Sequence, residues 1–165
     1  MNKLATLALS AAVTASLLAT PLASQEIIVS PVSAARFVAD VQSDLDRQLR
    51  RSQPAWDRAQ TGVTSVRFTA GEDGRADNIV TYRRSGSSSL DRAARRAVSR
   101  LTSLAPLPMG ASEGQLIQAN IVYAKSERHA DRLTRQLARE EAQRIASSPE
   151  ERAVLALTIG GTHGS

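Results

Sequence analysis

The stretch that decides the fold is Gly62–Ala124, GVTSVRFTAGEDGRADNIVTYRRSGSSSLDRAARRAVSRLTSLAPLPMGASEGQLIQANIVYA. Its first nine residues alternate in polarity, which places Val66 and Phe68 on the apolar face of a strand. Gly71–Gly74 has strong turn chemistry, and an extended, β-branched run follows over 75–82. The stretch therefore begins as a β-hairpin. Arg67 falls on the alternate face of its first strand, where we expect replacement by Ala to cost within about half a kcal/mol.

A helix and a third strand complete this unit. Leu90–Leu101 has helical period, and Ser88 with Asp91 three residues later resembles an N-terminal capping box. Leu116–Ala124 alternates again, with apolar residues from Ile117 to Tyr123 on one face. The order hairpin, helix, strand predicts a small α+β unit.

The N-terminus has the three parts of a secretory signal. Met1–Lys3 is a short basic start, Leu4–Leu18 is uncharged, and Thr20–Ser24 contains a proline and small residues. The apolar run is shorter than the roughly 20 residues that a membrane-spanning helix needs. We therefore expect a cleavable signal peptide over 1–24, with an uncleaved membrane anchor as the alternative.

Helical segments are predicted on both sides of the central unit. In the segment 25–52, Ser30 and Pro31 are typical helix-start residues, and an apolar stripe with helical spacing follows. Asp44 falls on the polar side of that helix. A short connector with Pro54 and Trp56 leads into the central unit, and we interpret the tryptophan as a hydrophobic anchor.

The segment 126–165 is predicted to be a helical extension. Glu127–Ala146 is charged with a thin apolar stripe, and Ser148–Glu151 is a capping box. The apolar run after this box predicts a second helix that stops at Gly160 and Gly161. The two helices would form a hairpin that docks on the domain.

Composition excludes several classes of function. The net charge is +5, cysteine is absent, and the chain has one Trp, two Tyr and two Phe. No disulfide or thiolate metal site is therefore available, and stacking platforms for single-stranded nucleic acid are disfavoured. His129 and His163 have no second ligand at metal spacing, and no nucleophile or phosphate-loop motif is present. We predict no catalytic residues, no metal and no cofactor, and we interpret the arginines at 92–100 as a solvated helix face.

The central unit resembles the TonB C-terminal domain family over about residues 53–125. The resemblance rests on Gly62-x-Thr64-x-Val66-x-Phe68, the turn and strand start Asp73–Asn78, the helix Leu90–Val98 (LDRAARRAV) and the loop Pro106–Pro108. It implies a three-stranded antiparallel sheet with one helix packed on a face. Here that unit would carry an N-terminal helix and a C-terminal helical hairpin.

The resemblance also implies how a partner binds. A short extended peptide of an outer-membrane receptor would add as a strand to the exposed edge of the last strand. The hypothetical edge consists of Gln115, Ile117, Gln118, Ala119, Asn120, Ile121, Val122 and Tyr123. The alternative is that the C-terminal helices cover this edge.

One departure from the family shapes the functional hypothesis. Energy transducers of the family keep an N-terminal membrane helix and a Pro-rich spacer, whereas residues 25–53 contain no repeated proline. We therefore interpret the chain as a non-enzymatic, periplasmic TonB-like module that binds an outer-membrane or envelope protein, with a link to transport as a further expectation. The alternatives are a membrane-anchored TonB-type transducer and a TolA-like envelope-integrity protein.

Overall fold

A computed structural model describes residues 33–52 and 60–162 of the chain. The predicted signal peptide, the helix start at Ser30 and Pro31, and the connector residues Pro54 and Trp56 lie outside these ranges. The described elements, in chain order, are α1 (Ala34–Ser52), β1 (Gly62–Ala70), β2 (Ala76–Arg83), α2 (Ser88–Val98), β3 (Leu116–Ala124), α3 (Glu127–Ser147), α4 (Pro149–Ala153) and β4 (Leu155–Thr162).

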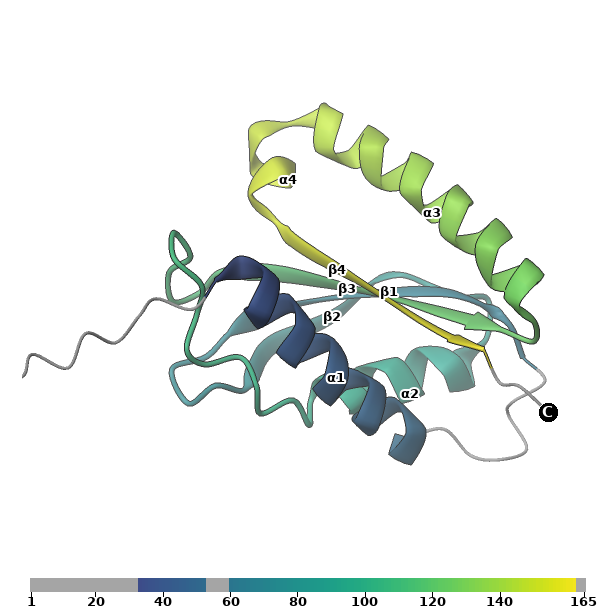
Figure 1. Ribbon diagram of the computed structural model, residues 1–165, viewed down its shortest axis with the longest axis horizontal. Helices are drawn as coiled ribbons and strands as arrows, with labels where there is room; N and C mark the ends of the chain where they lie inside the picture. The colour runs from purple at the N-terminus through teal and green to yellow at the C-terminus, as the bar shows by residue number, and fades with distance from the viewer. Residues whose placement is uncertain (1–32, 53–59, 163–165) are drawn as a thin grey trace, which may run out of the picture. The chain divides into compact units, whose positions relative to one another are not determined.

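The strands form one mixed sheet in the order β2-β1-β3-β4 (Figure 1). β1 is antiparallel to both of its neighbours, and β4 is parallel to β3. The hairpin turn uses Gly74 at φ +73°, where an added Cβ would lie 3.1 Å from the Cβ of Ala105. The predicted α+β class and the three predicted strands are confirmed, but the sheet has four strands and is not purely antiparallel.

The fourth strand corrects the predicted C-terminal helical hairpin. The capping box does start a helix, because the Ser148 hydroxyl accepts the Glu151 N–H at 3.2 Å, but α4 ends at Ala153. Residues 155–162 continue as a strand in which Leu155, Leu157 and Ile159 face the core. The alternation of these three residues is hard to recognise in the sequence because the residues around them are mostly apolar as well. A short apolar run does not by itself distinguish a strand from a buried helix.

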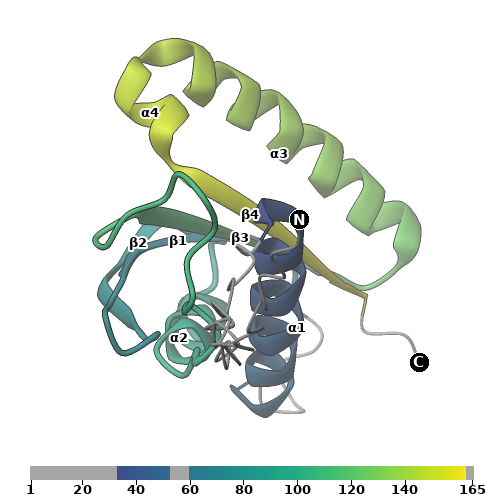
Figure 2. The ribbon, with the colours of Figure 1, turned by 60° about the vertical axis from the view of Figure 1, so that its left-hand side comes forward.

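Helices cover both faces of the sheet, with α1 and α2 on one side and α3 on the other (Figures 1 and 2). The main core lies on the α1/α2 side, where Phe37, Leu45, Phe68 and Leu90 are at most 2 % exposed. A second, smaller cluster on the α3 side joins Val63 and Val122 to Leu137 and Leu133. Arg67 lies on the alternate face as predicted, but that face is covered and the Arg67 side chain is only 12 % exposed, so we expect Arg67→Ala to cost more than about half a kcal/mol.

Asp44 is also buried, although the helical pattern placed it on the polar side of α1. It is 1 % exposed, and its carboxylate accepts hydrogen bonds from the N–H of Thr102 at 2.9 Å and the hydroxyl of Ser103 at 3.2 Å. These donors belong to the loop after α2, so the carboxylate joins α1 to that loop. Burial acts to raise the pKa of Asp44, but the bonds from Thr102, Gln48, Arg47 and Ser103 outweigh it and hold the pKa below its usual range.

The N-cap of α2 lies one residue before Ser88, the first residue of the predicted capping box. Ser87 is the N-cap and accepts the N–H of Leu90. Asp91 serves another purpose, since one of its carboxylate oxygens accepts hydrogen bonds from the hydroxyls of Thr64 and Ser85, each at 2.8 Å. This carboxylate therefore attaches the first turn of α2 to β1 and to the loop before the helix.

Candidate functional site: the β3 edge and the network beside it

The predicted binding edge lies in the interior of the sheet. Seven of its eight residues belong to β3, and Gln115 immediately precedes that strand. β3 pairs with β1 on one side and with β4 on the other, so that Asn120 lies between Ser65 and Thr158. The prediction of an exposed β3 edge is wrong because residues 155–162 occupy it, as a strand and not as the helices considered in the alternative.

The β3–β4 ladder is regular from end to end. Its register runs from Ile117 opposite Leu155 to Ala124 opposite Thr162, with no bulge. Parallel neighbours need a long crossover connection, and α3 with α4 provides it across the opposite face of the sheet. Leu157 and Ile159 of β4 are 2 % and 8 % exposed, so β4 contributes apolar side chains to the main core as well as backbone pairing.

A polar network on the α3 side holds this crossover against the sheet. The guanidinium of Arg67 on β1 donates to both carboxylate oxygens of Glu151 on α4, at 3.0 and 2.5 Å. Its Nε donates to Oε1 of Gln118 on β3 at 2.9 Å, and its centre lies 3.5 Å from the centroid of the Tyr82 ring. Arg67 therefore joins three strands to the turn that leads into β4.

Arg144 forms the second half of the network. Its Nε donates to Oε2 of Glu141 at 2.9 Å, and its Nη1 donates to Oε2 of Glu151 at 3.0 Å. Glu141 in turn accepts from the amide of Gln118 at 2.7 Å. Burial acts to lower the pKa of the Arg144 guanidinium, but the bonds to Glu151 and Glu141 outweigh this effect and raise the pKa above its ordinary value.

Glu151 is the shared acceptor of both arginines. The hydrogen bonds from Arg67 lower the pKa of its carboxyl, burial opposes this effect, and the hydrogen bond from Arg144 adds to the lowering. The carboxylate is therefore ionised at neutral pH and keeps both ion pairs. A charged, hydrogen-bonded centre of this kind fixes the position of α4 on the sheet.

The network continues into the interior of the sheet through Asn120. Its Oδ1 accepts from the hydroxyl of Ser65 at 2.6 Å and from Gln118 at 3.0 Å, while its buried Nδ2 has no hydrogen-bond partner. An unpaired buried amide nitrogen carries a desolvation cost. Asn120 therefore contributes less stability than its two accepted bonds alone would indicate.

Sequence reasoning placed Gln118 and Asn120 on one face of β3 but missed their partners Arg67, Glu141, Arg144 and Glu151. The available signal was the line of polar residues at alternate positions of both β1 and β3, which normally indicates a solvated face. In the part of the chain that the structure describes, no group of His, Cys, Asp or Glu side chains is arranged to hold a metal ion. Over the same residues, no helix has the length and apolar character of a membrane span.

The comparisons with known proteins identify the central segment. The family model of the Gram-negative bacterial TonB protein C-terminal domain matches residues 52–125, which contain β1, β2, α2 and β3. The match covers 74 of the 165 residues, so it shows what this segment is similar to. No curated protein and no solved structure matches the chain.

Proposed function

Because residues 52–125 are a TonB C-terminal-like domain, we propose that this protein is a periplasmic binding module that recognises an extended segment of an outer-membrane or envelope protein by strand addition to β3. The role of β4 follows from this proposal. β4 is a built-in competitor for the β3 edge, and a partner strand takes its place.

The observation that carries the proposal is the unbroken parallel ladder between β3 and β4. β4 comes from residues 155–162, outside the segment that matches the family, so β3 is the last strand of that segment. A strand that accepts eight consecutive partners in register has its backbone N–H and C=O groups arranged for an added strand. A partner in the same orientation would use the same groups.

The side chains of β4 indicate what such a partner should look like. Leu155, Leu157 and Ile159 face the core, while Ala156 and Thr158 are exposed. A replacing strand therefore needs apolar residues at alternate positions, with small or polar residues between them. Without those apolar residues, displacement of β4 would leave part of the core open to water.

Tethering makes β4 a strong competitor. β4 belongs to the same chain as β3 and is held beside it by the α3–α4 crossover, so a free peptide has to compete with an intramolecular partner. We therefore expect weak peptide binding by the complete chain and much tighter binding once β4 is removed. Recognition in the cell would then require a partner with additional contacts.

The first experiment uses the strand itself as a probe. A labelled synthetic peptide with the sequence of 154–162, VLALTIGGT, is titrated into a variant that ends at Ala153 and into the complete chain. We expect saturable binding to the shortened variant and at least tenfold weaker binding to the complete chain. A permuted peptide of the same composition, with the apolar residues out of alternation, is the control. If the shortened variant is folded and binds neither peptide, strand addition to β3 is ruled out.

A reversible disulfide between β3 and β4 tests whether β4 must leave β3 before the peptide binds to the complete chain. Ala119 and Leu157 are register partners, and the chain has no cysteine, so Ala119→Cys with Leu157→Cys introduces one disulfide between β3 and β4. Peptide binding should be lost in the oxidised variant and return on reduction, with the two single-cysteine variants unaffected by reductant. Equal binding in both redox states would show that the peptide binds elsewhere. Extended segments of outer-membrane receptors can then replace the probe to test the transport link.

The location is tested separately. Mass spectrometry of periplasmic extract should find a mature chain that begins at Gln25 or Ser24. An intact N-terminus in the membrane fraction would favour the anchored transducer instead.

A further inference from the structure

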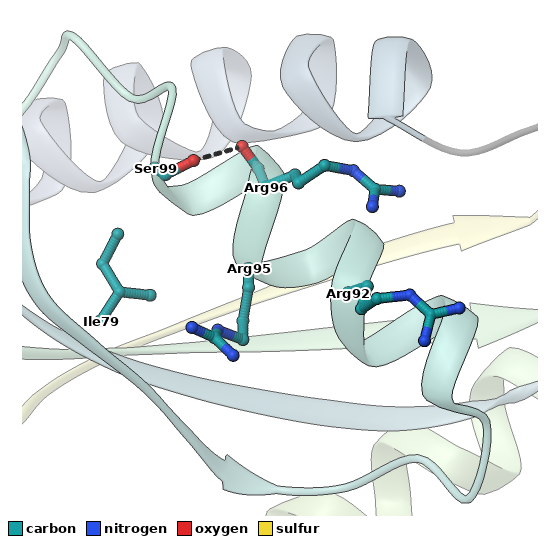
Figure 3. Close-up of a pocket in the computed structure, with 5 residues that line it drawn as sticks. All are labelled: Ile79, Arg92, Arg95, Arg96 and Ser99. Atoms are coloured by element: carbon teal, nitrogen blue, oxygen red, sulfur yellow. Dashed lines mark hydrogen bonds between the residues drawn. The ribbon is translucent and has the colours of Figure 1, made fainter.

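Two adjoining pockets lie between α2 and β2. One of about 270 Å³ is lined by Ile79, Arg92, Arg95, Arg96 and Ser99. A second of about 160 Å³ shares Arg92 and Arg95 and extends past Thr81, Arg84, Ser88 and Asp91. In Figure 3 the side chains of Arg92 and Arg96 extend to one side of α2, whereas Arg95 extends toward the side on which Ile79 lies. The pair of pockets is called the arginine groove below.

The groove carries a positive charge that its own residues do not neutralise. Among the described residues, Arg84, Arg92 and Arg95 form no ion pair. The one acid in the lining is Asp91, and one of its oxygens already accepts from Thr64 and Ser85. Exposed arginines elsewhere in the described part of the chain, such as Arg132 and Arg135 of α3, also form no ion pair there, so the groove differs from them in its concave lining. The net positive charge of this lining is complementary to an anion.

We propose that the arginine groove binds an acidic, extended segment of a partner protein. Neighbouring arginines three or four residues apart on a helix face stand about 5–6 Å apart at Cβ. Side chains at alternate positions of an extended peptide repeat every 6–7 Å, so successive acidic residues at this spacing can meet Arg92 and Arg95 in turn. Guanidinium groups bind carboxylates through paired, charge-assisted hydrogen bonds. Ile79, which lines the same pocket as Arg92 and Arg95, gives the peptide an additional apolar contact.

Recognition in this groove depends on side chains and not on strand addition to β2. β2 is the outer strand on the side of the sheet away from β4, but its pairing with β1 is broken by two irregularities, and Asn78 has a φ of +52°. Bulges of this kind disrupt the regular backbone edge that an added strand needs. The groove is thus distinct from the β3 edge in both location and chemistry, and it does not depend on the proposed function.

Two other occupants fit less well. A membrane surface would be expected to meet exposed apolar side chains beside the charges, but Val80 and Tyr82, the exposed large hydrophobic residues of β2, alternate with the groove residues Ile79 and Thr81 and so lie on the other face of the strand. A second copy of the chain docked through the same groove would bring two rows of arginines together. Both occupants are outcomes that the test below separates from the peptide.

The test compares a charged probe with its neutral counterpart. A labelled peptide with Glu at every second position and Thr between is titrated at about 50 mM salt, where surface charges are only partly screened. The matched peptide carries Gln in place of Glu. We expect saturable binding of the acidic peptide alone, and a decrease of roughly tenfold in affinity for the double variant Arg92→Gln, Arg95→Gln. Both arginines are exposed, so this variant should melt like the parent.

A charge-matched control separates the groove from general electrostatics. Arg132 and Arg135 of α3 are exposed and have the same spacing, so Arg132→Gln with Arg135→Gln removes the same charge from another face. This control should bind the acidic peptide like the parent. Equal losses in the two double variants, or no saturable peptide binding, would overturn the proposal. So would binding to phosphatidylglycerol vesicles without peptide binding, or self-association that only the Arg92/Arg95 variant abolishes.

Discussion

Arg67 of β1 and Glu151 of α4, which lie 84 residues apart in the chain, form a bidentate ion pair. Their side chains are only 12 % and 24 % exposed. Glu151 stands four residues before β4, and Arg67 lies opposite Gln118 of β3. The ion pair therefore holds α4 on the sheet, at the position from which the following residues reach β3 and pair with it as β4. If β4 competes with a partner for β3, this ion pair favours the arrangement in which β4 is paired with β3.

The first prediction is that Arg67→Ala lowers the free energy of unfolding by about 1.5–3 kcal/mol, because Oε1 of Gln118 loses its donor and the partly buried Glu151 carboxylate keeps, among the described residues, only Arg144 as a cationic partner. Denaturant melts measure the change. A double-mutant cycle with Glu151→Gln should show coupling of at least about 0.5 kcal/mol. Arg75→Ala is the control, since Arg75 and Asp73 are each 63 % exposed and their pair should contribute almost nothing. Equal effects at Arg67 and Arg75 would contradict the burial of the network.

The second prediction concerns acid stability and Asp44. The pKa of this carboxyl is lower in the folded chain than its ordinary value of 3.8, so its contribution is complete above the unfolded pKa and is lost as pH falls through the folded pKa. Asp44→Asn should therefore destabilise the protein at pH 7, and the difference from the parent should shrink as pH falls from about 5 to about 2. Asp40→Asn is the control, because Asp40 is 62 % exposed in its pair with Arg36. A difference that is constant with pH would exclude this ionisation as the cause.

The central hairpin, helix and strand could be predicted from sequence because each has a local signal. β1 and β3 have the predicted bounds, since their alternation and the flanking glycines define them without knowledge of the rest of the fold. The match of a family model to 52–125 agrees with the resemblance drawn from the same residues. Local patterns were sufficient wherever one face was apolar and the other polar.

The candidate edge could not be predicted because its state depends on a distant segment. A capping box defines where a helix begins but not where it ends, and the run after Ser148 contains both helix formers and an alternating Leu155, Leu157 and Ile159. Likewise, Glu151 of α4, the carboxylate that pairs with Arg67, lies 84 residues later in the chain. Tertiary contacts decided both outcomes.

The third prediction tests β4 as a core strand. Leu157→Ala should cost about 2–5 kcal/mol because the side chain is 2 % exposed, whereas Thr158→Ala on the exposed side should change stability by less than about 0.5 kcal/mol. Gly160→Ala should be tolerated, since a Cβ there meets no atom within 4 Å. Thermal or denaturant melts of the three variants decide the point. A helix over 155–159 would instead place neighbouring residues on overlapping faces and give no alternation.

The last prediction uses proline to distinguish an interior strand from an outer one. Asn120 lies in β3 between two pairing strands, so its N–H points toward a ladder partner whichever side it faces, and Asn120→Pro should unfold the sheet. Thr158 lies in the outermost strand, and its carbonyl accepts the amide of Gln42 on α1 at 3.0 Å. The N–H and C=O of one strand residue point to the same side, so the Thr158 N–H should point away from β3. Thr158→Pro should therefore keep the fold, with a loss of unfolding free energy well below that of Asn120→Pro.

Asn120→Ala is the control, because it removes the side chain and keeps the N–H. Circular dichroism and denaturant melts measure the secondary structure and the stability of all three variants. If Asn120→Pro melts like Asn120→Ala, β3 has a free backbone edge and β4 does not pair with it.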